Sequence, residues 1–130
     1  MPISQVKEIA LYVKDLEKSK EFYHHLLGFD IIGEVKDRHI FFRVGSSVLL
    51  CFNPEATRQD TILPPHFAYG HQHIAFEVPQ EEYESWKIKI TALEIQIVHE
   101  HDWGKGFQSF YFKDVDDHVL EIVPAGMWGY

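Results

Sequence analysis

One strand-like pattern occurs twice in this chain, and the repeat limits what it can fold into. Residues 7–13 (KEIALYV) and 72–78 (QHIAFEV) share Ile, Ala and Val in register. His73 follows Glu8 by 65 residues, half of the 130-residue chain. Both segments are rich in β-branched and aromatic residues and lack Pro and Gly, which predicts a strand. A repeat of this length predicts two modules built from the same elements.

A helix is predicted after each of these strands. Asp15 is a suitable N-cap for the first helix and Gly28 a suitable stop, while Pro79 ends the strand before the second helix. Apolar residues then recur at roughly helical spacing: Leu16, Tyr23, Leu26 and Leu27 in the first half, and Tyr83, Trp86 and Ile90 in the second, up to about Leu93. Both helices are short enough to require packing against a sheet.

Three further strands are predicted in each half. They span residues 30–34, 39–44 and 47–53 in the first half, and 94–100, 107–113 and 119–123 in the second. The chain is therefore predicted to be an α+β protein of two βαβββ modules in a single domain. Module one covers about residues 5–54, a linker containing Pro follows over about 55–70, and module two covers about 71–124.

Composition narrows the classes of partner. The formal net charge is −8, with 12 Lys and Arg against 20 Asp and Glu, so neither nucleic acid nor an anionic membrane surface is an expected partner. No apolar run is long enough to cross a bilayer, and the first residues lack the pattern of a secretion signal, so a cytoplasmic location is expected. The lone Cys51 lies in an apolar run and is predicted to be buried and inert.

Polar residues occur at related positions within the predicted strands. Glu121 interrupts the apolar run of residues 119–123, and Leu50 occupies the matching place in the first half. A carboxylate inside an apolar strand costs several kcal/mol unless it is paired or binds a cation. His73 directly precedes the apolar run of its strand, and Glu8 does the same in the first half. Three residues that can bind metal therefore occupy comparable places.

With these features the chain resembles the vicinal-oxygen-chelate superfamily, which contains glyoxalase I. Residues 9–23 with 27–29 are similar to its N-terminal pattern, residues 73–78 to its central one and residues 110–121 to its C-terminal one. The resemblance implies a curved mixed sheet, forming a cup or open barrel with flanking helices. It also implies a divalent metal in the cup, with Glu8, His73 and Glu121 as ligands. Leu50, at the fourth ligand position, cannot coordinate a metal.

One imidazole and two carboxylates suit Mn, Fe, Ni, Co or Zn and leave coordination positions for water or a small-molecule substrate. In the superfamily, a metal with open positions chelates two adjacent substrate oxygens. The resemblance therefore implies a lyase, a thiol transferase or a dioxygenase. Glu121, leaving the metal, and His101 are the candidates for acid–base catalysis. Small two-module members usually pair, so a homodimer is expected.

Residues 101–112 are the best guide to the substrate. Their Gly residues predict a mobile loop before a strand, in which alternation places Phe107, Ser109 and Tyr111 on one face. Fosfomycin-resistance thiol transferases resemble the chain at Ser109 and Tyr111, which implies contacts to a phosphonate. Lys105 would add positive charge there. Packing in the wall of a barrel explains Ser109 and Tyr111 equally well.

Other features separate the chain from the best-known members. Ala10 replaces a hydroxyl residue and His101 a lysine of the fosfomycin enzymes, and Leu50 replaces the proton-transferring glutamate of glyoxalase I. The loop containing Trp103 and the last residues resemble small uncharacterised glyoxalase-like proteins. The alternative is a metal-free binding protein of the bleomycin-resistance type, with a cleft lined by aromatic residues. The predicted substrate-binding residues are Leu50, Trp103, Lys105, Phe107, Ser109 and Tyr111. In the metal-free alternative, the cleft would be lined by Phe41, Trp103, Phe107 and Tyr111.

Overall fold

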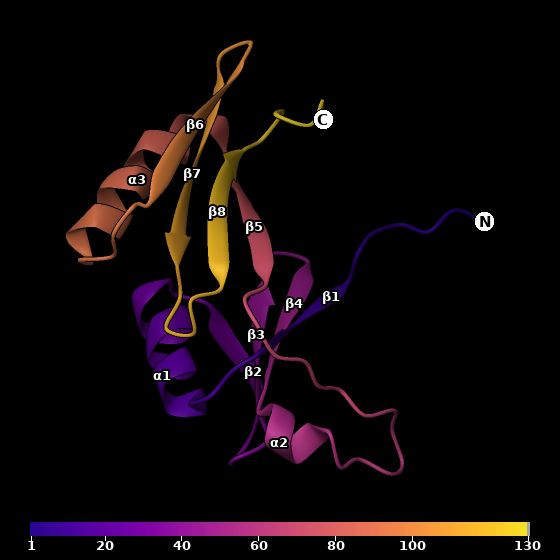
Figure 1. Ribbon diagram of the computed structural model, residues 1–130. Coiled ribbons are helices and arrows are strands. Elements are labelled where there is room, and N and C mark those ends of the chain that lie inside the picture. Colours follow the sequence, from indigo (N-terminus) through magenta and orange to yellow (C-terminus); the bar gives the residue numbers. More distant parts are fainter. Residues whose placement is uncertain (130) are drawn as a thin grey trace. The chain divides into compact units, whose positions relative to one another are not determined.

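The computed structural model describes residues 1–129 and divides into two compact units between Gly70 and His71. The first unit contains one sheet with the strand order β1-β4-β3-β2 (Figure 1). Its elements are β1 (Glu8–Tyr12), α1 (Leu16–Lys20), η1 (Glu21–Leu26), β2 (Asp30–Val35), β3 (His39–Val44), β4 (Ser47–Phe52) and α2 (Pro54–Thr57). None of the helices in residues 1–129 has the length and apolar character of a membrane span.

The second unit repeats this plan, with the strand order β5-β8-β7-β6 (Figure 1). Its elements are β5 (His73–Val78), η2 (Gln80–Glu82), α3 (Tyr83–Ala92), β6 (His99–Gly104), β7 (Phe107–Lys113) and β8 (Val119–Pro124). In both sheets the first and last strands of the module pair in parallel and the other pairs are antiparallel. The predicted α+β class with two βαβββ modules is confirmed, and both mixed sheets are open.

The register of the parallel pairs is the same in both sheets. Ala10 lies opposite Leu50 in the first sheet, and Ala75 lies opposite Glu121 in the second. The predicted equivalence of Leu50 and Glu121 therefore holds at the level of single residue pairs. Glu8 and His73 are likewise the first residues of their strands.

Helix ends follow the predicted chemistry. The Asp15 carboxylate accepts hydrogen bonds from the backbone N–H groups of Glu17 and Lys18, at 3.0 and 3.2 Å. Gly28 ends this helical segment with φ of +82°, a conformation that favours Gly. The segment continues as a π-helix over η1, a change of helix type that the sequence pattern does not reveal.

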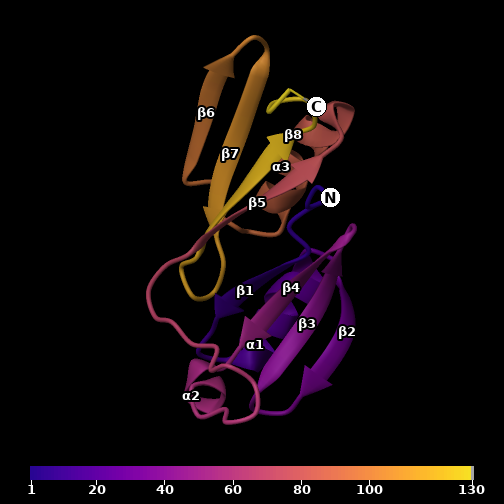
Figure 2. The ribbon, with the colours of Figure 1, turned by 90° about the vertical axis from the view of Figure 1, so that its right-hand side faces the viewer.

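Each sheet packs one face against the helix of its own unit. Figure 2 shows the first sheet with α1 behind it. The rings of Tyr23 from η1 and Phe42 of β3 pack together, with 5.7 Å between their centroids. In the second unit Tyr83 of α3 lies 5.5 Å from the ring of Phe110. Cys51 belongs to the first of these cores and is fully buried, as predicted.

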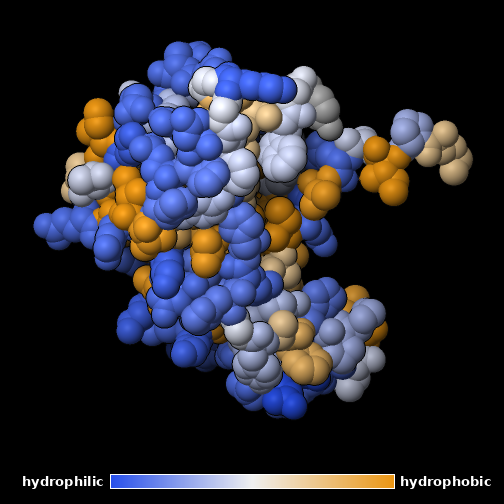
Figure 3. Space-filling model, turned by 45° about the horizontal axis from the view of Figure 1, so that its top comes forward, coloured by the Kyte–Doolittle hydropathy of each residue, from blue (hydrophilic) through white to orange (hydrophobic). Residues whose placement is uncertain are grey.

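The N-terminal residues contribute little to this packing. Residues 1–7 precede β1 and belong to no helix or strand. The side chains of Ile3 and Val6 are exposed. Figure 3 shows hydrophobic residues, in orange, along the segment that extends to the right of the molecule. The first sheet therefore begins at Glu8.

Two predictions for the second half are wrong. The strand predicted over residues 94–100 begins only at His99, because Glu94 has a positive φ of 61° and the backbone N–H of Ile95 still bonds to the carbonyl of Ile90 at the helix end. The segment predicted as a loop from His101 is strand β6 up to Gly104, since it pairs with β7. Only the tight turn at Lys105 and Gly106 remains as a loop.

All six residues of β6 are exposed, and this edge strand is held by its pairing with β7 and by contacts of its side chains. Glu100 makes the connection to the helix. Its carboxylate accepts a hydrogen bond from the Tyr83 hydroxyl at 2.8 Å and pairs with the Lys87 ammonium at 2.7 Å. These two partners, with the Lys87 ion pair first, hold the pKa of Glu100 below its ordinary value, against the opposing effect of burial.

We therefore expect Glu100→Gln to lower the free energy of unfolding by about 1 kcal/mol at neutral pH, because the ion pair is lost and the hydrogen bond weakens. A depressed carboxyl pKa gives stability that is present above the ordinary value of 4.5 and lost as the pH falls through the lower folded value. Urea unfolding between pH 3 and 7 measures the difference. Glu84→Gln, at an exposed carboxylate that also pairs with Lys87, is the matched control. Equal losses in both variants would contradict the role assigned to Glu100.

Candidate metal centre and substrate surface

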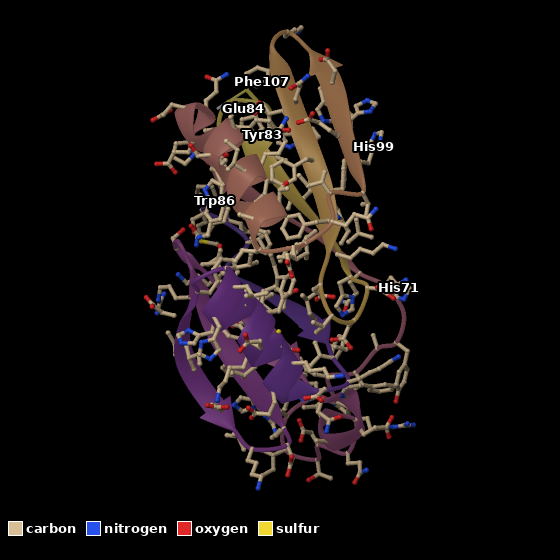
Figure 4. The ribbon with its side chains drawn as sticks, turned by 90° about the vertical axis from the view of Figure 1, so that its left-hand side faces the viewer. His71, Tyr83, Glu84, Trp86, His99 and Phe107 are labelled. Carbon is tan, nitrogen blue, oxygen red and sulfur yellow. The ribbon has the colours of Figure 1, made fainter. Side chains whose placement is uncertain are left out.

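The second sheet has one polar face. Strand alternation places Phe110, Phe112, Leu120 and Ile122 in the core beneath α3, and the residues between them on the other side. Figure 4 shows Tyr83 between α3 and the sheet and His99 projecting from β6 away from the helix. We call this second side the polar face, and it comprises His73, His99, His101, Trp103, Ser109, Tyr111 and Glu121.

His73 and Glu121 meet on this face. The Nε2 atom of His73 lies 3.2 Å from Oε1 of Glu121, and Nδ1 lies 2.8 Å from the backbone carbonyl oxygen of Val119. A carbonyl oxygen can only accept, so Nδ1 carries a hydrogen and donates it. In the neutral ring Nε2 therefore presents its lone pair to the carboxylate, the tautomer that a metal ligand needs.

Two electron-rich atoms at 3.2 Å repel each other unless a proton or a cation lies between them. Neighbouring ligands in the shell of a first-row metal stand about 2.9 to 3.4 Å apart, given metal–ligand bonds of about 2.0 to 2.2 Å. The spacing of Nε2 and Oε1 therefore suits two ligands of one divalent ion as well as it suits an ion pair with a protonated imidazole.

The burial of Glu121 favours a cation. Its side chain is only 7% exposed, and Oε2 has no hydrogen-bond partner among residues 1–129. A buried carboxylate oxygen without a partner carries a desolvation cost of several kcal/mol, which metal coordination removes. The residues present therefore fit a divalent metal at this position.

Tyr111 lies beside this pair. It is the register partner of Glu121, and its ring centroid is 6.1 Å from that of His73. Burial raises the pKa of the Tyr111 phenol, and the Glu121 carboxylate raises it further. The phenol therefore keeps its proton at neutral pH and can donate a hydrogen bond to a substrate oxygen next to the metal position.

Ser109 is covered in the structure. Its hydroxyl accepts a hydrogen bond from the indole N–H of Trp103 at 2.9 Å, and the residue has no exposed surface. Trp103 itself is 52% exposed. A substrate could reach Ser109 only if the indole moved aside, so Trp103 is the outer member of the pair.

The remaining predicted substrate-binding residues are Phe107, Lys105 and Leu50. Phe107 is half-buried beside Gly126, at the start of β7 directly after the hairpin turn. Lys105 is exposed in the turn itself, with a positive φ of 57°. Leu50 belongs to the first unit, where it is 7% exposed and pairs with Ala10 and Phe41.

Glu8 is an exposed residue of the first unit, at the start of β1. Within either unit, among residues 1–129, no group of three His, Cys, Asp or Glu side chains gathers around a metal position. The structure therefore brings two of the three predicted ligands, His73 and Glu121, close together. That Glu8 is the third ligand stays a prediction.

The family-model comparison matches residues 5–122 to the Glyoxalase/Bleomycin resistance protein/Dioxygenase superfamily. The chain belongs to this superfamily. It is 31% identical over 121 residues to the metallothiol transferase FosB of Staphylococcus epidermidis, covering 92% of this chain and 83% of that protein.

Solved structures of the superfamily are similar over nearly the whole chain. A lactoylglutathione lyase from Agrobacterium tumefaciens has a TM-score of 0.95, with 30% identity and all of both chains covered. A mutant of the fosfomycin resistance protein FosX from Listeria monocytogenes, in complex with Mn(II) and 1S,2S-dihydroxypropylphosphonic acid, has a TM-score of 0.69. It is 27% identical and covers 94% of this chain and 90% of that one.

The polar face contains one histidine that the sequence prediction missed. The predicted strand over residues 94–100 contains His99 near its end, so the pattern does not show that His99 lies on the polar face. The spacing of His99 and His101 was the available signal, because residues two apart on a strand share a face. His101, predicted on a mobile loop, lies instead on β6 opposite Ser109.

Glu121→Gln should stabilise the metal-free protein. The substitution removes a buried charge, and the amide can donate to the lone pair of His73 Nε2, so at pH 8 after chelation we expect a gain of about 1 kcal/mol, or roughly 4 °C in Tm. Thermal unfolding followed by circular dichroism measures it. Glu77→Gln, at an exposed position of β5, is the control and should be neutral. A lower Tm for Glu121→Gln would show that the carboxylate is satisfied without a metal.

Proposed function

We propose that this superfamily member is a divalent-metal-dependent enzyme that adds a thiol or water to a small electrophile bearing an anionic oxygen group. The observation that carries the proposal is the pair formed by His73 Nε2 and the buried Glu121 carboxylate, whose Oε2 has no hydrogen-bond partner among residues 1–129. The relationship to a metallothiol transferase and to a Mn(II)-containing fosfomycin resistance protein supports the same class of reaction.

In this proposal His73 and Glu121 hold the metal, and Glu8 supplies a third ligand. Bound there, the ion would act as a Lewis acid toward the substrate oxygens. One imidazole with two carboxylates suits Mn, Fe, Ni, Co or Zn. The side chains around the metal then have two tasks: they orient the substrate, and they donate and accept the protons of the reaction.

The phenol of Tyr111 suits the second task. It stays protonated beside Glu121, so it can donate a hydrogen bond to the oxygen that becomes negative when an epoxide C–O bond breaks. In thiol addition a new S–C bond forms at that carbon, and the oxygen takes up the proton that the thiol has lost. His101, on the same face, is the proposed base that receives the thiol proton and returns it to the oxygen.

Leu50 argues against lactoylglutathione lyase chemistry. It occupies the position equivalent to Glu121 and is buried between apolar neighbours, so the first module offers no carboxylate there to move a proton. This residue therefore favours addition over isomerisation as the reaction.

The first experiment is the metal content of protein purified without a histidine tag or chelator, with assay of thiol addition to fosfomycin by mass spectrometry. We expect near-stoichiometric Mn, Fe, Ni, Co or Zn and measurable adduct with the bound metal. His73→Ala should lose both, because it removes the only imidazole of the proposed ligand set. His25→Ala, at an exposed histidine of η1, should lose neither.

Three outcomes would change the proposal. Protein that contains no metal and regains none on adding each ion would favour the alternative of a metal-free binding protein. Metal that is retained in full by His73→Ala would remove the proposed centre. Metal without turnover of fosfomycin would leave the centre and exclude this electrophile as the substrate.

We also propose that the chain acts as a cytoplasmic homodimer, with a metal position that takes Glu8 from one chain and His73 with Glu121 from the other. Two inactive variants can then complement each other. Glu8→Gln and His73→Ala should each lower metal affinity at least tenfold, since each removes a ligand. The two variants are then mixed, unfolded and refolded together. In each hybrid dimer one of the two sites should bind metal again, because it combines the intact Glu8 of one chain with the intact His73 of the other.

Equilibrium dialysis with Mn(II), before and after mixing, measures this recovery. Refolding each variant alone is the control. If mixing restores no binding while both variants refold, the three ligands come from one chain or Glu8 is not among them.

A further inference from the structure

Neither histidine of the second pair on the polar face is a ligand in the proposed reaction centre. His101 is also the proposed base, and a metal bound to its imidazole would take up the lone pair that the base needs. His99 and His101 lie two residues apart on β6, and their rings are 5.6 Å apart between centroids. The Nε2 atom of His99 and the Nδ1 atom of His101 are 3.4 Å apart. The nitrogen-bearing edges of the two rings are therefore turned toward each other.

We propose that His99 and His101 form a second metal site, which binds a late divalent transition metal such as Zn(II). Two imidazole nitrogens bound to one tetrahedral Zn(II) stand about 3.3 to 3.4 Å apart, given Zn–N bonds of about 2.0 to 2.1 Å. The observed spacing already matches this value. Because both side chains are exposed, a modest rotation about χ2 can direct both lone pairs at one ion.

Nothing else in the described part of the chain occupies these nitrogens strongly. The contact at 3.4 Å is at the outer limit of a hydrogen bond, so it holds the pair together only weakly. Their other neighbours are rings: Tyr111 lies 5.9 Å from His99, and Trp103 lies 4.5 Å from His101. These ring contacts limit the positions of the imidazoles and leave the facing nitrogens accessible.

The ligand chemistry distinguishes this site from the one at His73 and Glu121. A pair of neutral imidazoles favours Zn(II), Ni(II) or Cu(II), whereas a site with carboxylates also accepts Mn(II). No acidic residue completes a group of three within residues 1–129, so water or an external ligand has to fill the remaining positions. The second site should therefore be the weaker of the two and open to exchange.

Isothermal titration of the chelator-treated protein with Zn(II), and separately with Mn(II), tests the proposal. We expect about two Zn(II) per chain but about one Mn(II). His101→Asn should reduce Zn(II) to about one and leave Mn(II) unchanged, which also shows that the sheet is intact. The control His25→Ala has the same number of histidines as His101→Asn and should retain both Zn(II) sites.

The outcomes separate this inference from the proposed function. His73→Ala should lose Mn(II) binding and keep the Zn(II) that depends on His101. If the wild type binds no Mn(II) and His101→Asn still lowers the number of bound Zn(II) by one, the proposed reaction centre alone is overturned. If His101→Asn still binds two Zn(II), the site at His99 and His101 is overturned. It is also overturned if the wild type binds one Zn(II) and Mn(II) displaces that ion, because both metals then share one site.

Discussion

The hydrogen bond from His73 Nδ1 to the Val119 carbonyl is the constraint on which the candidate centre depends. It exists because β5 and β8 pair in parallel with His73 opposite Val119, two residues before Glu121 on β8. The same register therefore fixes the tautomer of the imidazole and brings Nε2 to the carboxylate. A shift by one residue would turn Glu121 into the core beneath α3, where no partner could satisfy it.

This arrangement gives the second sheet two faces with opposite requirements. Beneath α3, Phe110 and Leu120 fill a close-packed core, while on the other side Glu121 is buried with one unpartnered oxygen. Stability alone would favour an apolar residue at that position, as Leu50 shows in the first sheet. A buried charge kept at such a cost is characteristic of a functional site, because the cost is recovered only when a ligand binds.

The sequence allowed much of this to be predicted, because strand pairing repeats at a fixed offset. The repeat located both modules, and the apolar strand around Glu121 identified the unusual residue. Prediction failed where local signals gave no warning: the positive φ of Glu94 delays β6, and the π-helix follows an ordinary helical pattern. Because β6 begins later than predicted, the place of His99 on the polar face was missed. The partner of Glu8 depends on an arrangement of modules that strand patterns do not encode.

Comparison of the two modules shows that equivalent positions of the two sheets differ in polarity. Leu50 and Phe41 pair in the first sheet as Glu121 and Tyr111 pair in the second, so equivalent positions carry apolar and polar chemistry respectively. A carboxylate at position 50 would lie between Ala10 and Phe41, neither of which can offer its side chain as a donor. The first module therefore cannot reproduce the pair of the second. The proposed ligand from the first module is Glu8 at the strand start, where the side chain is exposed and free of that burial cost.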